Sequence, residues 1–127
     1  MLVRDYDEAK AWYADVLGLK VVEDTALDNG RRWVLLAPPG SRETRVLLAR
    51  AADPDQVRRV GDQTGGRVFL FLHTSDFAAD YDRLRARGVR FSGAPRFESF
   101  GVVAVFQDLY GNRWDLLQPR FATEPPP

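Results

Sequence analysis

The sequence predicts an α+β fold built from two similar βαβββ modules, and three observations lead to this prediction. A helix-opening pattern occurs at residues 5–19 and again at residues 76–89. Each copy has an acidic N-cap, an amphipathic segment, a glycine and an apolar strand start, and such a repeat indicates a duplicated half-domain. Strand-like runs separated by turn residues follow both copies. The run at residues 68–72, Val-Phe-Leu-Phe-Leu, is apolar throughout, as expected of a strand covered on both faces.

In the first module, a helix is expected to begin after Asp5, because Glu8 three residues later completes an acidic capping box. Gly18 suits the left-handed position that ends such helices. The Asp-Asn-Gly of residues 28–30 is typical of a turn, and the Pro-Pro-Gly of residues 38–40 predicts a loop. Strands are expected at residues 1–4, 19–23, 32–37 and 45–49.

In the second module, Asp76 is the expected cap of a helix that Gly88 ends. Between the modules, Asp53 followed by Pro54 predicts a short helix over residues 54–60. Strands are expected at residues 68–72, 89–91, 102–106 and 112–117. We therefore divide one domain, residues 1–127, into module one at about 1–50, a linker at 51–66, module two at about 67–119 and a tail at 120–127.

The apolar strand at residues 68–72 also indicates that the modules surround a cavity. Alternation assigns Leu70 and Leu72 to one face, and Phe69, Phe71 and the following His73 to the other. If a helix covers the first face, the second face, which is also apolar, must be covered as well. We expect a curved mixed sheet, built from both modules, around an apolar cavity of the kind that binds small ligands.

Composition excludes several functional classes. With 45% apolar and 28% charged residues, the 127-residue chain is an ordinary globular sequence with enough length for a core. Eighteen basic and eighteen acidic residues give zero formal net charge, which argues against nucleic-acid or membrane-surface partners. The absence of cysteine excludes disulfides and thiolate chemistry. No run approaches the ~20 apolar residues of a membrane span and the start does not look like a secretory signal, so we expect a cytoplasmic protein.

Three segments of the chain together resemble one family. They are Asp5-Tyr6-Asp7-Glu8-Ala9 with Trp12-Tyr13 and Leu17-Gly18-Leu19, then residues 76–89, then Asp108-Leu109-Tyr110-Gly111-Asn112-Arg113-Trp114-Asp115-Leu116. On these segments the chain resembles the glyoxalase/bleomycin-resistance/extradiol-dioxygenase superfamily, which has the vicinal oxygen chelate fold. The resemblance covers nearly the whole chain. It implies paired βαβββ modules and, because many members are dimeric, a homodimer.

The resemblance also implies where the enzymes of this family hold a divalent metal. They use four inward-facing side chains, mostly His and Glu, on the first and last strands of each module. Here the first position falls before Met1, the second falls on Val46 or Leu47, and the third falls on Phe69. Only Asp115, at the fourth, is a candidate ligand. Because a catalytic ion needs about three protein ligands, we expect no metal and no other cofactor.

Two polar residues are the main candidates for contact with a ligand. His73, the single histidine, is either a hydrogen-bonding group or general base, or a strand-end side chain that meets solvent. Asp115 stands in an apolar strand, where a carboxylate is costly unless it is paired. It therefore meets either a polar ligand or an arginine such as Arg67 or Arg96.

Other side chains were weighed in the same way. Glu98 either borders the cavity or is a solvated surface charge, and the turn residues Asp108, Gly111 and Asn112 are structural rather than catalytic. Four aromatic residues form either a box for a planar ligand or ordinary core: Trp33, Phe69, Phe71 and Phe106. Two arginine pairs are expected on the solvated surface, at residues 31–32 and 58–59.

We therefore expect metal-free binding of a small, partly aromatic molecule, as the resemblance to antibiotic-sequestering members of the family implies. The expected ligand-binding residues are Trp33, Phe69, Phe71, His73, Glu98 and Asp115. One alternative is a metal-dependent lyase, dioxygenase or isomerase that uses His73, Asp115 and Glu98, with a dimer partner completing the set. Another is a metal-free enzyme with His73 as its base, the only candidate catalytic residue.

Overall fold

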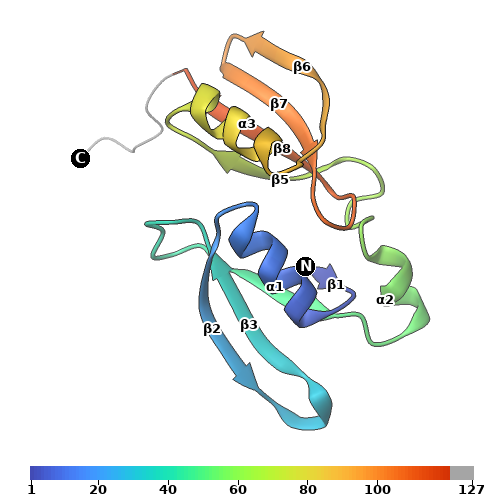
Figure 1. The fold of residues 1–127 in the computed structure, drawn as a ribbon. Coiled ribbons are helices and arrows are strands. Elements are labelled where there is room, and N and C mark those ends of the chain that lie inside the picture. The colour runs from blue at the N-terminus through green and yellow to red at the C-terminus, as the bar shows by residue number, and fades with distance from the viewer. Residues whose placement is uncertain (121–127) are drawn as a thin grey trace. The chain divides into compact units, whose positions relative to one another are not determined.

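The structure is a computed structural model that describes residues 1–120, so the predicted tail lies almost wholly outside the described residues. The chain divides into two compact units, and the boundary lies between Gly65 and Gly66. Each unit contains a four-stranded sheet and a ten-residue helix, α1 (Tyr6–Asp15) in the first and α3 (Phe77–Ala86) in the second (Figure 1). The predicted α+β class and the two similar modules are confirmed.

The remaining elements follow the predicted order. In the first unit they are β1 (Leu2–Val3), β2 (Lys20–Ala26), the 3₁₀ turn η1 (Asp28–Gly30), β3 (Arg32–Ala37), β4 (Val46–Arg50) and the short helix α2 (Pro54–Arg59). In the second unit they are β5 (Val68–His73), β6 (Phe91–Glu98), β7 (Gly101–Gln107) and β8 (Arg113–Pro119). No helix among residues 1–120 combines the length and the apolar character that crossing a membrane requires.

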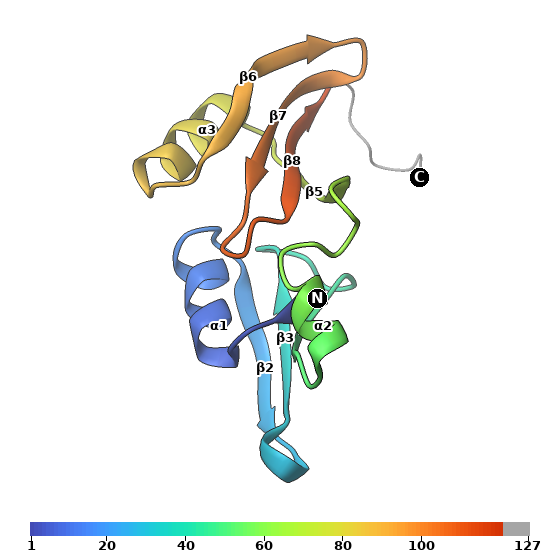
Figure 2. The same ribbon diagram turned by 90° about the vertical axis from the view of Figure 1, so that its right-hand side faces the viewer.

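The two sheets are paired by the same scheme. Their strand orders are β1-β4-β3-β2 and β5-β8-β7-β6, of which the second can be followed in Figure 2. The first strand of each unit pairs in parallel with the last. All other neighbours are antiparallel. The expected mixed strand directions are therefore present, and the strands are divided into two four-stranded sheets, one in each unit.

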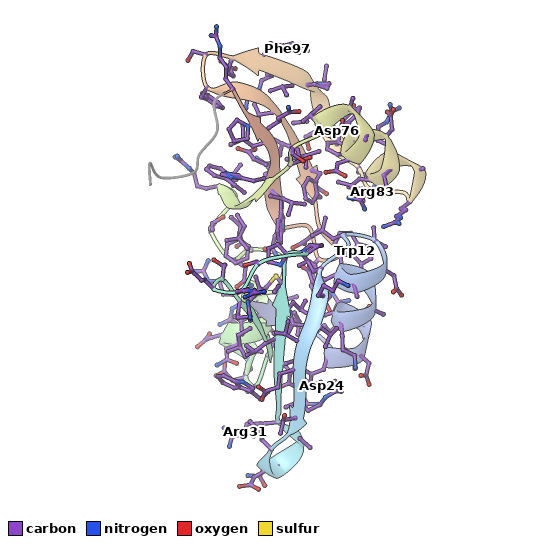
Figure 3. All side chains as sticks on the ribbon, turned by 90° about the vertical axis from the view of Figure 1, so that its left-hand side faces the viewer. Trp12, Asp24, Arg31, Asp76, Arg83 and Phe97 are labelled. Carbon is purple, nitrogen blue, oxygen red and sulfur yellow. The ribbon has the colours of Figure 1, made fainter. Side chains whose placement is uncertain are left out.

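Both helices begin where the capping residues predict, and α3 also ends where its glycine predicts. The side chain of Asp5 accepts a hydrogen bond from the backbone N–H of Glu8 at 2.8 Å. Asp76, which lies at the start of α3 (Figure 3), accepts one from Ala79 at 3.1 Å. The glycines that follow the two helices have positive φ, 84° at Gly18 and 88° at Gly88, a conformation that costs other residues free energy. Gly88 directly follows the C-cap Arg87 of α3, whereas Gly18 lies two residues beyond the C-cap Val16 of α1, so α1 ends earlier than its glycine predicts.

Each helix covers one face of the sheet of its own unit. In the first unit, Ala9 and Tyr13 of α1 are buried together with Val34, Leu36 and Leu48 of the sheet. In the second unit, the buried set is Phe77, Leu84, Ala104, Phe106, Trp114 and Leu116. We call the opposite face of each sheet its far face. The register places Trp33, Leu35 and Leu47 on the far face of the first sheet, and Phe71, Asp115 and Leu117 on that of the second.

Strand β6 is longer than expected. The prediction ended this strand at residue 91, whereas β6 continues to Glu98 and contains Pro95. A proline without an N–H is tolerated because β6 is the edge of its sheet. The pairing also shifts register between Ser92 and Arg96, where Gly93 has a φ of 81°. A bulge of this kind interrupts the alternation that a sequence-based prediction relies on.

Candidate functional site

The far face of the second sheet brings together several of the predicted site residues. Phe71 of β5 lies opposite Asp115 of β8, and Asp115 lies opposite Val105 of β7. His73, the last residue of β5, is opposite Leu117 and exposed. The neighbouring Leu70 and Leu72 are opposite the buried Trp114 and Leu116 on the helix side, so the predicted division of this strand into two faces holds for residues 70–73.

The other predicted residues are placed less centrally. Phe69 is half-buried at a register shift in β5, where its strand is locally irregular. Glu98 is exposed at the end of β6 and accepts a hydrogen bond from Arg96 Nη1 at 3.4 Å. Trp33 belongs to the first unit, where it is 42% exposed and lines a cavity formed by residues of that unit. Phe106 does not belong to an aromatic box, because it is fully buried in the core and stacks on Trp114.

Asp115 has the most unusual environment of the predicted set. The carboxyl group is half-buried between apolar neighbours, and its Oδ1 is buried without a hydrogen bond from the described residues. Burial raises the pKa of the Asp115 carboxyl above its ordinary value, and the positive charge of Arg96 opposes this shift. The only ion pair that Arg96 forms within residues 1–120 is with Glu98, at 3.4 Å. The positive charge of Arg96 therefore acts on the Asp115 carboxyl group, but Arg96 donates no hydrogen bond to Oδ1.

The donor set of the chain does not fit the divalent metal that the family resemblance implies. The resemblance implies a second metal ligand at Val46 or Leu47. Leu47 lies on the far face of the first sheet, whereas Val46 is paired with the buried Leu36 on the helix side. Phe69 stands at another position that the resemblance implies, so Asp115 is the one candidate ligand among the implied positions within residues 1–120. Within the described part of the chain, no group of three or more His, Asp or Glu side chains could hold a metal ion. About three ligands are needed, so we derive no step through a metal.

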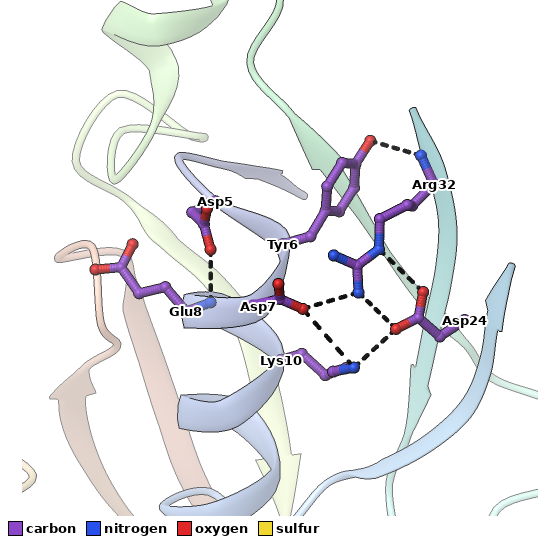
Figure 4. A network of polar contacts seen from close by, with 7 residues as sticks. All are labelled: Asp5, Tyr6, Asp7, Glu8, Lys10, Asp24 and Arg32. Atoms are coloured by element: carbon purple, nitrogen blue, oxygen red, sulfur yellow. Dashed lines mark hydrogen bonds and ion pairs between the residues drawn. The ribbon is translucent and has the colours of Figure 1, made fainter. Parts of the chain in front are cut away.

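The first unit contains a network of charges that sequence reasoning missed (Figure 4). Arg32 Nη2 lies 2.6 Å from Asp24 Oδ2 and 2.9 Å from Asp7 Oδ1, and Lys10 Nζ lies 2.8 Å from Asp24 Oδ2. The hydrogen bonds from Arg32 and then from Lys10 lower the pKa of Asp24 to about 2. Arg32 is thus bound to acidic partners, contrary to the expectation of a free surface side chain.

A signal for this network exists in the sequence. Asp24 and Arg32 flank the turn at residues 28–30, so a hairpin brings them to neighbouring strands. Asp7 and Lys10 are three residues apart on α1, which places them on one side of the helix. Whether the hairpin pair meets the helix pair depends on the register of the β2–β3 hairpin. The turn residues alone do not specify that register.

The duplicated βαβββ architecture, with one far-face carboxylate in place of a full set of metal ligands, defines a vicinal-oxygen-chelate-type protein. The chain belongs to the Glyoxalase/Bleomycin resistance protein/Dioxygenase superfamily, whose family model matches residues 1–116. An uncharacterized protein of Shewanella frigidimarina (strain NCIMB 400) is 50% identical over 119 residues, which cover 93% of this chain and 88% of the relative.

Solved structures agree with this family assignment. UcmS2 is 30% identical with a TM-score of 0.79, over 92% of each chain. TnmS3, an antibiotic binding protein from Streptomyces sp. CB03234, is 32% identical with a TM-score of 0.70, over 94% of this chain and 92% of its own. The family likeness thus extends through both units.

Proposed function

We propose that this protein binds a small, partly aromatic molecule without a metal, on the far face of its second sheet. The observation that carries the proposal is the buried Oδ1 of Asp115, which accepts no hydrogen bond from the described residues. A buried acceptor destabilises the protein until a donor reaches it. A ligand with an amine or hydroxyl hydrogen would supply that donor.

The neighbours of Asp115 support an aromatic ligand. Phe71 is opposite Asp115 in the sheet and is 61% exposed, so its ring offers apolar surface beside the carboxyl group. Val105 and Leu117 extend this apolar surface. An amine would favour the ionised carboxylate and thus oppose the effect of burial on the pKa of Asp115. Phe69, His73 and Glu98 of the same unit remain predicted ligand contacts, whereas Trp33 belongs to the first unit and stays a separate prediction.

The relatives support the same class of function. TnmS3, which is 32% identical to this chain, is described as an antibiotic binding protein. The two chains match over more than nine-tenths of their lengths, so the resemblance includes both units. An antibiotic-sequestering role is therefore the form of small-molecule binding that we propose.

The enzymatic alternatives have less support. A metal-dependent lyase, dioxygenase or isomerase would require more ligands than Asp115, and within residues 1–120 no cluster of three candidate ligands exists. It would therefore depend on side chains supplied by a dimer partner. A metal-free enzyme would depend on His73, so His73→Ala should abolish its turnover and spare its ligand affinity.

The proposal is tested by thermal-shift screening in chelator-containing buffer. The panel consists of aromatic compounds that carry an amine or hydroxyl group, each paired with an analogue that lacks the polar hydrogen. We expect some donors to raise the melting temperature of the wild type, and Asp115→Asn to weaken their binding by about tenfold or more. The matched control is Asp82→Asn, which changes an exposed carboxylate on α3.

Two results would contradict the proposal. One is equal affinity of the wild type and Asp115→Asn for every compound that binds. The other is a ligand-bound crystal structure in which Phe71 and Asp115 do not contact the ligand.

We also propose that the protein is a cytoplasmic homodimer. The family resemblance supports the dimer, and a sequence without cysteine is compatible with a reducing compartment. Light scattering after gel filtration measures the first part, and a mass of one chain, close to 14.4 kDa, at micromolar concentration would contradict it. Cell fractionation measures the second.

A further inference from the structure

A cavity in the first unit has a chemistry different from that of the far face around Asp115. It encloses about 600 Å³ at the end of the first sheet where β3 begins and β4 ends, beside the turn η1. Its lining includes Arg31, Trp33, Leu47, Ala49 and Arg50. Arg31 follows the turn at the end of the β2–β3 hairpin (Figure 3).

The cavity is positively charged. Arg31, Arg32 and Arg50 line it, and no residue that lines it in the described part of the chain is acidic. The charge of Arg32 is balanced within its network, in which Arg32 and Lys10 face the two carboxylates of Asp7 and Asp24. The charges of Arg31 and Arg50 remain.

Both remaining arginines are bound to neutral groups. Arg31 Nε donates to the carbonyl oxygen of Asp28 at 3.4 Å, and Arg50 Nη2 donates to the carbonyl oxygen of Gly30 at 3.3 Å. Neither forms a salt bridge with a carboxylate within residues 1–120. A guanidinium has five N–H donors, so a single carbonyl leaves most of its donors for another acceptor.

Arg50 is held in position before any ligand arrives. Its guanidinium carbon lies 5.4 Å from the centre of the Tyr6 ring, a distance typical of a cation–π contact. Gly30 has a φ of 74°, and a side chain at this position would meet Arg50 Nη2 at 3.3 Å. The glycine therefore permits both the left-handed turn and the close approach of Arg50.

The other three of these lining residues are apolar. Trp33 is 42% exposed, and Leu47 and Ala49 lie beside it in the lining of the cavity. Trp33, Arg31 and Arg50 line the same cavity, in which the tryptophan offers a flat surface for a ring and the arginines offer planar forks for a carboxylate.

We propose that this cavity binds a small aromatic carboxylic acid, with its ring against Trp33 and its carboxylate on Arg50 and Arg31. This goes beyond the proposed function, because the cavity uses no residue of the second unit and does not depend on Asp115. Bidentate pairing of arginine with a carboxylate is strong and directional. The neutral amide of the same ring lacks the charge that the arginines bind.

The test uses 1-naphthoate and its neutral isostere 1-naphthamide, titrated into the complete chain and followed by ¹H–¹⁵N NMR and calorimetry. We expect saturable shifts of the Gly30 amide and of the Trp33 indole N–H, the latter assigned with Trp33→Phe. The amide should bind about tenfold more weakly or worse. Arg50→Gln and Arg31→Gln should each cause a similar loss for naphthoate, and Arg50→Lys should cause a smaller one.

Two controls separate this site from other effects. Arg85→Gln removes an arginine that also lies over a tyrosine ring, 5.3 Å from the centre of Tyr81 in the second unit, and should leave naphthoate affinity unchanged. Asp115→Asn should also leave it unchanged, so failure of the proposed far-face function would not affect this result.

Three results would overturn the proposal. They are the absence of saturable binding of naphthoate at millimolar concentration, equal affinity of the acid and the amide measured at the Gly30 and Trp33 signals, and naphthoate shifts that are confined to the second unit. Because Arg31 and Arg50 are exposed, the glutamine variants should fold, and their NMR spectra verify this before each titration.

Discussion

Asp24 in the first unit and Asp115 in the second both project from a strand of a four-stranded sheet, and their surroundings are opposite. Asp24 accepts hydrogen bonds from Arg32 Nε at 3.1 Å, Arg32 Nη2 at 2.6 Å and Lys10 Nζ at 2.8 Å. Asp115 has apolar neighbours and a buried Oδ1 that accepts none from the described residues. The same architecture therefore contains a satisfied carboxylate in one unit and an unsatisfied one in the other.

The difference is reflected in the two pKa values. Hydrogen bonds from Arg32 and Lys10 lower the pKa of Asp24 to about 2, whereas burial raises the pKa of Asp115. A carboxylate that is ionised and paired stabilises the fold, and one that is desolvated without a donor destabilises it. We infer that the first serves stability, and the proposed ligand would supply the donor that the second lacks.

A third carboxylate sharpens this comparison and should give the largest effect. Asp108 accepts hydrogen bonds from the backbone of Tyr110 and Asn112, the side chain of Asn112 and the indole of Trp114, all between 2.9 and 3.1 Å. Asp108→Ala leaves the buried Asn112 and Trp114 donors without this acceptor. We expect the free energy of unfolding to fall by about 3 kcal/mol. Urea unfolding measures this, and a loss below about 1 kcal/mol would show that the network is not structural.

Asp115→Leu should change stability in the opposite direction. Removing an unsatisfied carboxylate from apolar surroundings should raise the free energy of unfolding at pH 7 by about 1 kcal/mol while ligand binding is lost. The folded state keeps the Asp115 proton to a higher pH than the unfolded chain does, so the cost appears as pH rises above the ordinary pKa of 3.8. The advantage of the leucine variant should therefore shrink as pH falls toward 4, which urea unfolding at several pH values would reveal.

A leucine variant that is less stable than the wild type at pH 7 would contradict the contrast drawn between Asp24 and Asp115. It would mean that the Asp115 carboxylate has a stabilising partner in the free protein. Asp115→Asn serves as the conservative control, because it removes the charge and keeps the shape.

Asp24→Asn should destabilise the protein by about 1 kcal/mol at pH 7, since it weakens a network with a bidentate arginine. The pKa of Asp24 is depressed in the folded state, so its stabilising contribution is present above 3.8 and is lost as pH falls toward about 2. The difference in melting temperature between the wild type and Asp24→Asn should decrease over that range. A constant difference across it would indicate that the charge of Asp24 is not what stabilises the hairpin.

The smallest effect is expected at a fully solvated pair. Arg58 and Asp55 form an ion pair on α2, with side chains that are 68% and 87% exposed. Asp55→Asn should change the free energy of unfolding by about 0.3 kcal/mol or less, because water screens the pair. Urea unfolding in low and high salt measures it. An effect as large as that of Asp24→Asn would refute the distinction between the network and an isolated pair.

Local features of the fold could be predicted from the sequence because they depend on few neighbours. Asp5 and Asp76 specify helix starts and Gly88 specifies the end of α3, through contacts within a few residues. Asp115 could be singled out as a costly carboxylate because its strand is apolar.

Features that depend on strand pairing could not be predicted. Phe106 could be either core or part of an aromatic box, because alternation shows that a strand has two faces and does not say which one the helix covers; the structure places it in the core. The network around Arg32 depends on the register of a hairpin, and β6 depends on its edge position, which makes Pro95 tolerable. These properties arise only when separate segments of the chain pair.

The central claim is that the chain binds its ligand through Asp115 without a metal. The most direct measurement is calorimetric titration of a compound found in the thermal-shift screen, performed on chelator-treated protein and on protein reloaded with Mn, Fe, Co, Ni or Zn, with the metal content determined by mass spectrometry. The account predicts equal affinity in every preparation, no retained metal, and binding about tenfold weaker or worse in Asp115→Asn. Retention of about one equivalent of any ion, together with binding that requires it, would contradict the account and favour the enzymatic alternative.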